Sequence, residues 1–179
     1  IGDWNYWSME SDNMSHVKGG IWEAYVTNAC IGQRYKFALR PRNSLEFITK
    51  ADPFARRNET PPATASIIWE TSFDWSDDDW LANRSTTQSI ASPISIYEMH
   101  LGSWKMPNGE FPSYRAICSE VIQHLQRCGF THVELLPITG HPYYPSWGYQ
   151  CLGYFAPTSR FGDPDDFKYF VNELHKAGI

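Results

Sequence analysis

Several sequence patterns that would indicate a particular chemistry are absent from this chain of 179 residues. There is no Cys-x-x-Cys pair or Cys/His set at zinc spacing, no His-Glu-x-x-His, no glycine-rich phosphate loop and no Gly-x-Ser-x-Gly. These absences argue against the common zinc, nucleotide-phosphate and serine-hydrolase sites. We expect neither a metal nor a cofactor.

Clustered positive charge is also missing. The chain has no run of Lys or Arg, and its formal net charge is −5. Nucleic acids and anionic membrane surfaces attract basic patches, so neither is expected as the main partner. No stretch approaches the roughly 18 consecutive apolar residues of a membrane helix. A neutral ligand fits this composition better.

Cysteine is scarce and shows no pairing pattern. The four residues, Cys30, Cys118, Cys128 and Cys151, lie at unrelated spacings. Reduced thiols in a reducing compartment are the economical interpretation. We therefore expect a cytoplasmic protein, with a plastid as the alternative.

Aromatic residues, by contrast, are abundant, with eight Trp, ten Tyr and ten Phe. Most aromatic rings fill cores, but sugars also stack their flat C–H faces on exposed rings. Residues 139–162, called the aromatic loop below, form a connection that is long and unusually aromatic. We expect a sugar-binding edge there, with His141, Trp147 and Tyr149 as candidate substrate-binding residues. The alternative, that these rings only hold the loop in place, stays open.

The first half of the chain has the pattern of a small β-sandwich. Apolar and polar residues alternate in residues 20–26 and 33–39, as in strands with one buried face, and residues 45–48 add a β-like run. Turn residues at 52–62 predict a long irregular exit. We predict a β-sandwich over residues 1–80.

After Pro93 the pattern changes to strands that alternate with helices. We predict a strand at 94–101, a helix at 114–128 between Ser113 and Gly129, a strand at 131–138, a helix from Pro164 to Gly178, and a third strand beginning at Ile179. Successive strand–helix units imply parallel strands with right-handed crossovers. Two such strands cannot complete a sheet, so we expect a fragment of a larger α/β fold.

Two carboxylates on the predicted strands are candidates for acid–base chemistry. Glu98 shares a face with His100, and Glu134 shares one with His132. Catalytic groups of parallel α/β barrels lie at the carboxyl ends of strands, whereas these residues lie further back. We interpret them as structural polar groups, paired inside a barrel.

Both halves also contain motifs that resemble one family. In the second half these are residues 96–104 (IYEMHLGSW), 128–138 (CGFTHVELLPI), 141–142 (HP), 147–150 (WGYQ) and 156–162 (APTSRFG). In the first half they are residues 2–7 (GDWNYW), 20–23 (GIWE), 32–37 (GQRYKF) and 50–54 (KADPF). The chain closely resembles glycogen branching enzymes of the α-amylase superfamily, glycoside hydrolase family 13.

The resemblance implies a multi-domain protein. It predicts an immunoglobulin-like β-sandwich of the carbohydrate-binding-module type at residues 1–80, incomplete at its N-terminus, a connector at 81–92, and the first two strand–helix units of an α/β TIM (β/α)8 barrel at 93–179. Gly140 departs from the family pattern, because an acidic residue is usual before the His-Pro pair. Cys151 and Leu152 replace the more common pair after Trp-Gly-Tyr-Gln.

The resemblance also implies a function. Branching enzymes cleave an α-1,4-glucan (glycogen, amylose or amylopectin) and transfer the chain to a 6-hydroxyl, in a retaining mechanism that uses a carboxylate nucleophile and a carboxylic acid. Their catalytic residues belong to later strands, so none is expected in these 179 residues. Tyr149 corresponds to the aromatic platform at the subsite just before the cleaved bond. The alternatives are a non-catalytic glucan-binding protein and a related trehalose-releasing or α-glucan hydrolase.

Overall fold

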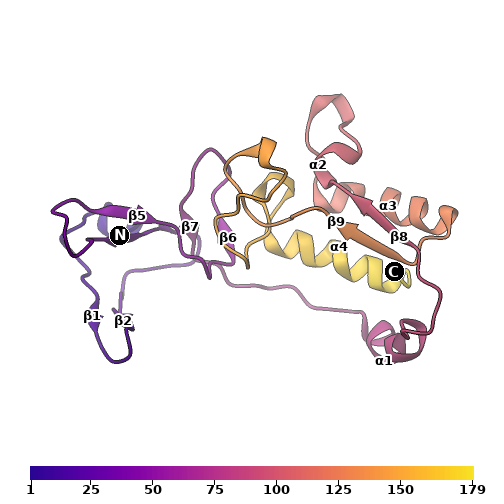
Figure 1. Ribbon diagram of the computed structural model, residues 1–179, viewed down its shortest axis with the longest axis horizontal. Coiled ribbons are helices and arrows are strands. Elements are labelled where there is room, and N and C mark those ends of the chain that lie inside the picture. The colour runs from indigo at the N-terminus through magenta and orange to yellow at the C-terminus, as the bar shows by residue number, and fades with distance from the viewer.

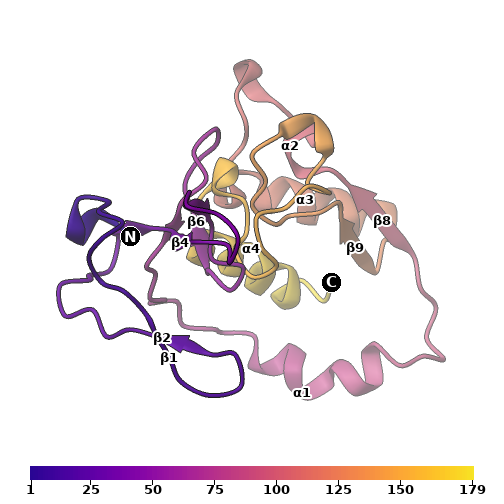
Figure 2. The same ribbon diagram turned by 60° about the vertical axis from the view of Figure 1, so that its left-hand side comes forward.

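The computed structural model describes residues 1–179, except for the side chain of Pro107. Its elements form two groups along the chain (Figure 1). Short antiparallel strands make up the first 70 residues, and helices packed on a parallel strand pair make up the second half. The aromatic loop lies between the two groups, beside the last strands of the first (Figures 1 and 2).

The first half contains seven strands, each of two or three residues. They are β1 (Ser15–His16), β2 (Trp22–Glu23), β3 (Arg34–Tyr35), β4 (Phe37–Leu39), β5 (Ile48–Lys50), β6 (Arg57–Asn58) and β7 (Ser66–Ile67). All pairs are antiparallel, in three small sheets: β1-β2, β3-β7-β6 and β4-β5.

The antiparallel β character predicted for this half is therefore confirmed, although the strands are shorter than the alternation suggests. Three of them, β1, β6 and β7, were not predicted. β6 lies in the segment interpreted as an irregular exit and β7 lies just after it, and strands of two residues are too short to show a periodic pattern. β6 and β7 form a local hairpin across a Pro-rich turn, and β7 also pairs with β3, which lies much earlier in the chain.

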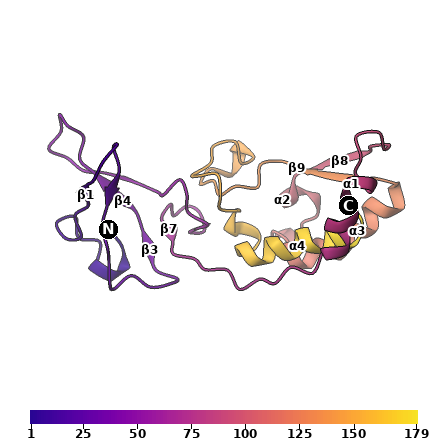
Figure 3. The same ribbon diagram turned by 90° about the horizontal axis from the view of Figure 1, so that it is seen from below.

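The second half is a β-α-β unit followed by a helix. It consists of β8 (Ile96–Met99), α3 (Tyr114–Cys128), β9 (His132–Leu135) and α4 (Pro164–Lys176). β8 and β9 pair in parallel, so the predicted α/β character is confirmed. Both helices lie on one side of the strand pair (Figure 3).

The bounds of α3 and α4 agree with the sequence prediction because strong local signals mark their ends. The Ser113 hydroxyl accepts a hydrogen bond from the Ala116 N–H, and Gly129 ends α3 with φ +75°. The Asp163 carboxylate caps α4 by accepting from the backbone N–H groups of Asp165 and Asp166. These bonds satisfy amide groups that a helix terminus otherwise leaves without partners.

The hydrophobic core lies between α3, α4 and the inner face of the strand pair. Tyr114, Val121, Leu125 and Phe170 are completely buried. Tyr97, Val133 and Leu135 of the strands pack against this cluster. The Tyr114 hydroxyl donates to the Thr158 carbonyl at 2.9 Å, which fastens α3 to the end of the aromatic loop.

A helix interrupts the segment that the sequence suggested was a polar connector. α1 (Asp78–Thr87) follows a long extended stretch after β7 (Figure 2). The Trp80 ring stacks on His175 of α4, with centroids 3.7 Å apart and planes 2° from parallel. His175 Nδ1 and the buried Asp77 carboxylate lie 2.6 Å apart. The sequence of this segment is charged and only weakly amphipathic, so it does not indicate a helix. Packing on α4 stabilises the helix instead.

Strand β8 ends earlier than predicted. It stops at Met99, and a short helix, α2 (Leu101–Trp104), begins at the last residue of the predicted strand, with His100 as its N-cap. A Cβ on Gly102 would lie 2.9 Å from the Tyr144 hydroxyl oxygen and 3.0 Å from the Phe161 ring. Close packing against the aromatic loop thus sets this turn. Ile179 lies in no strand of the described chain, and its N–H bonds to the Leu174 carbonyl.

Candidate functional site

The aromatic loop is closed by backbone hydrogen bonds at its base. Thr139 forms an antiparallel bridge with Pro157, and the Thr158 N–H donates to the Ile138 carbonyl at 2.7 Å. The Gly140 N–H donates to the Ala156 carbonyl at 2.8 Å. Because its two ends are joined, the loop projects from the carboxyl end of β9 as one ordered unit. This is the end at which parallel α/β folds place their ligands.

The tip of the loop presents two exposed aromatic side chains. The short 3-10 helix η3 (Tyr144–Ser146) ends at Trp147, whose φ of +56° is left-handed. Gly148 continues at φ +93°, and a Cβ there would lie 2.3 Å from the Pro137 carbonyl oxygen. This sharp reversal leaves Trp147 59% exposed and Tyr149 72% exposed. Both rings are available to a flat apolar ligand surface.

His141 lies beneath this surface rather than on it. It is only 2% exposed, and its Nδ1 lies 2.9 Å from the Thr139 carbonyl oxygen. Arg160 donates to the carbonyl oxygens of His141 and Pro142, at 2.6 and 3.4 Å, and its guanidinium lies over the Tyr144 ring. Burial lowers the pKa of His141, and the nearby Arg160 charge acts in the same direction.

His100 joins the cluster from the end of β8, and the sequence did not identify it as a site residue. Its ring centroid lies 5.8 Å from that of Tyr144 and 6.4 Å from that of Trp147. Burial lowers its pKa, with a smaller contribution from His141. The position of His100 directly after the carboxyl end of a parallel strand could have indicated a site residue. Its contacts with Tyr144 and Trp147 depend on the fold.

The two strand glutamates are neighbours in the structure. Glu98 lies opposite Glu134 in the register of β8 and β9, and both are exposed on the face away from the helices. Neither has an ion-pair partner among the residues described, so the pairing expected from the sequence is not seen here. Both lie within the strands and away from Trp147 and Tyr149.

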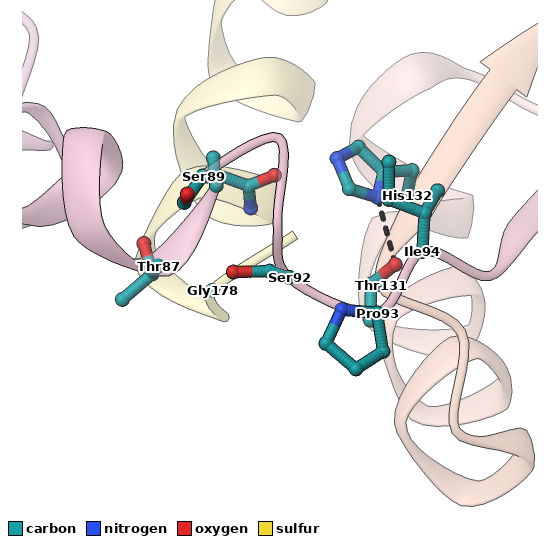
Figure 4. A pocket seen from close by; sticks show the side chains of 9 residues that line it. Thr87, Ser89, Ser92, Pro93, Ile94, Thr131, His132 and Gly178 are labelled. Carbon is teal, nitrogen blue, oxygen red and sulfur yellow. Dashed lines mark hydrogen bonds between the residues drawn. The ribbon is translucent and has the colours of Figure 1, made fainter.

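Two pockets occur elsewhere in the structure. A pocket of about 100 Å³ lies at the amino ends of β8 and β9, where Thr131 Oγ1 and His132 Nδ1 are 2.7 Å apart (Figure 4). A second, of about 320 Å³, lies between α1 and α4 and includes Trp80 and His175. Neither adjoins the aromatic loop. Within the described residues no group of three or more His, Cys, Asp or Glu side chains could hold a metal ion.

Comparison with known families and solved structures defines the class of protein. Residues 1–55 match Carbohydrate-binding module 48 (Isoamylase N-terminal domain). A structure from Salmonella typhimurium, titled as an alpha amylase, covers 93% of this chain with a TM-score of 0.71 at 26% identity, over 26% of its own length. Pullulanase type I from Bacillus subtilis covers 93% with a TM-score of 0.64 at 21% identity, again over 26% of its length. The chain thus has a carbohydrate-binding module and shares the fold of about a quarter of these amylase-type structures.

The sequence relatives narrow this class to one family. A 1,4-alpha-glucan branching enzyme GlgB from Albidiferax ferrireducens is 49% identical over the whole of this chain and 29% of its own length. Enzymes of the same name from Hydrogenovibrio crunogenus and Aliivibrio fischeri are 44% and 42% identical over the whole chain and 25% of their lengths. The chain is thus homologous along its whole length to 1,4-alpha-glucan branching enzymes, and it spans between a quarter and three tenths of these relatives.

No helix among the described residues has the length and apolar character needed to cross a membrane.

Proposed function

We propose that this chain is the N-terminal part of an enzyme that cleaves an α-1,4-glucan chain and transfers it to a 6-hydroxyl, forming an α-1,6 branch. The observation that carries the proposal is the 49% identity, along the whole chain, to an enzyme with that name. The exposed aromatic tip at the carboxyl end of β9 supports it, because a neutral glucan needs apolar rings more than charged groups.

The proposed reaction is a retaining double displacement. One carboxylate attacks the sugar to form a glycosyl-enzyme, and a carboxylic acid protonates the leaving oxygen and later activates the acceptor hydroxyl. In this proposal both groups lie outside these 179 residues. The part described here binds and orients the glucan.

We further propose that β8, α3, β9 and α4 are the first two strand–helix units of a TIM barrel. Tyr97 and Met99 of β8 face the helices and pack in the core, whereas Ile96 and Glu98 are exposed on the opposite face. A barrel strand has the same two sides, one toward the surrounding helices and one toward the barrel interior. The exposed face of the strand pair would therefore line that interior.

Within this site, Tyr149 would be the aromatic platform at the subsite just before the cleaved bond. Trp147 would form a second wall, since both rings project from the same tight turn. His141 is too deeply buried to reach a glucan, so its proposed role is to support the turn from below.

The proposed organisation keeps a carbohydrate-binding module at residues 1–80, a connector at 81–92 and the start of the barrel at 93–179. The connector then includes much of α1. Glycogen, amylose or amylopectin would be the substrate. The proposed location is the cytoplasm, with a plastid as the alternative, and the four cysteines, all free thiols in the structure, are compatible with either.

The test uses the complete reading frame that contains these residues. The purified protein is incubated with amylose, and the products are treated with a debranching enzyme that cleaves only α-1,6 linkages. Release of new short chains, absent from an untreated control, is the expected result. The isolated 179 residues serve as the matched control and should produce no branches.

Two other outcomes would refute the proposal. Binding of amylose without any new α-1,6 linkage would indicate a non-catalytic glucan-binding protein. Release of free trehalose or of reducing sugar, without branching, would indicate a related hydrolase.

A further inference from the structure

The aromatic loop rests on the carbohydrate-binding module. The Tyr154 N–H donates to the Pro53 carbonyl at 3.4 Å, and a Cβ on Gly153 would lie 2.7 Å from the same carbonyl oxygen. The rings of Phe54 and Phe155 stack 5.5 Å apart at 13°. Residues 53–54 and 153–155, about 100 residues apart in sequence, therefore pack directly against each other.

Asn58 also packs against the aromatic loop, at Gly140, and is 2% exposed. Its Oδ1 accepts a hydrogen bond from the Ser66 hydroxyl at 3.5 Å, whereas its Nδ2 has no hydrogen-bond partner among the described residues. That Nδ2 lies 2.8 Å from the position that a Cβ would occupy on Gly140. Asn58 therefore fills the space into which a side chain at position 140 would extend.

This packing gives a physical reason for glycine at position 140. The φ of Gly140 is not in the left-handed range, so its conformation alone does not demand glycine. The neighbouring Asn58 favours glycine instead, because a Cβ within 3.0 Å of its Nδ2 would force this buried side chain to move.

Gly140 is also well placed to move the tip of the loop. Its carbonyl accepts from the Leu152 N–H at 2.8 Å, and its own N–H donates to the Ala156 carbonyl. It directly precedes His141, whose ring lies beneath Tyr144 with centroids 6.4 Å apart. Continuous contacts connect Gly140 to the turn that carries Trp147 and Tyr149. A shift of the Gly140 backbone would therefore move that turn as well.

We propose that Asn58 is a positioning residue, through which the carbohydrate-binding module sets the position of the glucan-binding loop by packing against Gly140. The proposal rests on the function proposed above. It assigns Asn58 no contact with the glucan. Asn58 would affect glucan binding only through its contact with Gly140. The volume of the side chain at one of these two positions limits which residue fits at the other.

The proposal can be tested with variants that enlarge the side chain at position 140 and shorten the side chain at position 58. In the complete protein, Gly140→Ala places a methyl group against Asn58, and Asn58→Ala leaves a space beside Gly140. In the double variant the two Cβ atoms would be 3.6 Å apart, which is ordinary van der Waals contact. Asn43→Ala, at an exposed turn of the same module, is the matched control.

The measurements are kcat and KM for branching of amylose, the dissociation constant for a linear maltooligosaccharide, and the melting temperature. We expect each single variant to raise KM and the dissociation constant at least fivefold, with kcat changed less. The double variant should return to within about twofold of the parent, because size complementarity is restored. Asn43→Ala should behave as the parent.

Strictly additive losses in the double variant would overturn the proposal. So would single variants with unchanged glucan affinity, or losses of activity that follow the melting temperature in all variants, since a purely structural role predicts the latter. A parent protein that binds maltooligosaccharide but forms no α-1,6 linkage would refute the proposed function alone. The dissociation constants would still test the pair.

Discussion

Replacing Tyr149 by alanine should separate glucan binding from folding. The side chain is 72% exposed, so folding covers little more than a quarter of it. For a side chain of about 200 Å², that is about 55 Å² of buried area, worth at most about 1.4 kcal/mol at 25 cal/mol per Å². Its backbone N–H bonds to the Ser146 carbonyl at 3.0 Å and is unchanged by the substitution. The stability of the protein should therefore fall by about 1.4 kcal/mol or less.

The effect on activity should be larger than the effect on stability. A ring that stacks on the sugar at the cleaved bond contributes most when that sugar flattens toward the transition state. We expect Tyr149→Ala to lower kcat/KM for amylose by about 10- to 100-fold, equivalent to about 1.4–2.7 kcal/mol of transition-state stabilisation. Tyr149→Phe keeps the ring and should stay within about threefold of the parent.

The assay measures initial rates of α-1,6 linkage formation, together with chemical denaturation of each variant. Unchanged kcat/KM in Tyr149→Ala would show that the ring does not contact the reacting sugar. A loss in Tyr149→Phe equal to that in Tyr149→Ala would assign the effect to the hydroxyl group and refute the stacking argument.

Three further predictions concern the loop and the helix that follows it. Gly148→Ala should destabilise the loop by about 2 kcal/mol or more, because the residue is left-handed and its Cβ would clash with the Pro137 carbonyl; hydrogen exchange of the loop amides should accelerate, and unchanged exchange would contradict this. Asp163→Ala should reduce the free energy of unfolding by about 1 kcal/mol, whereas Asp163→Ser, which can still cap α4, should recover most of it in chemical denaturation. Because burial lowers the pKa of His141 and His100, their folded forms resist protonation, so the opened loop takes up protons first as the pH falls below about 6.5. The loop amides should therefore be less protected against hydrogen exchange at pH 5.5 than at pH 7.5, after correction for the intrinsic exchange rate. Equal protection at the two pH values would show that protonation of these histidines does not destabilise the loop.

Prediction from sequence was most accurate where local chemistry marks an element's ends. Ser113 and Asp163 are capping residues, and the apolar stripes that follow them have helical spacing, so α3 and α4 were predicted almost to the residue. It was least accurate for α1 and for β6 and β7. These elements have weak patterns of their own. Distant partners support two of them, since α1 packs on His175 and β7 pairs with β3.

The candidate site, like the fold, was only partly predictable from the sequence. The sequence indicated Trp147 and Tyr149 because they lie in an unusually aromatic loop directly after the second predicted strand, and both are exposed in the structure. His141 belongs to the same motif, but its burial could not be read from the sequence. The position of His100 beside Trp147 depends on the end of β8 meeting the loop, which no local pattern encodes.

The sequence by itself determined the antiparallel and α/β halves, the two main helices and the family, because these depend on periodicity, capping and motifs that each lie within a few dozen residues. Only the tertiary structure decided that His141 is buried, that His100 lies beside Tyr144 and Trp147, and that Asn58 of β6 packs on Gly140 of the loop. Those facts depend on distances between segments up to about 80 residues apart. Such distances follow from how the whole chain packs, so no single stretch of the sequence contains them.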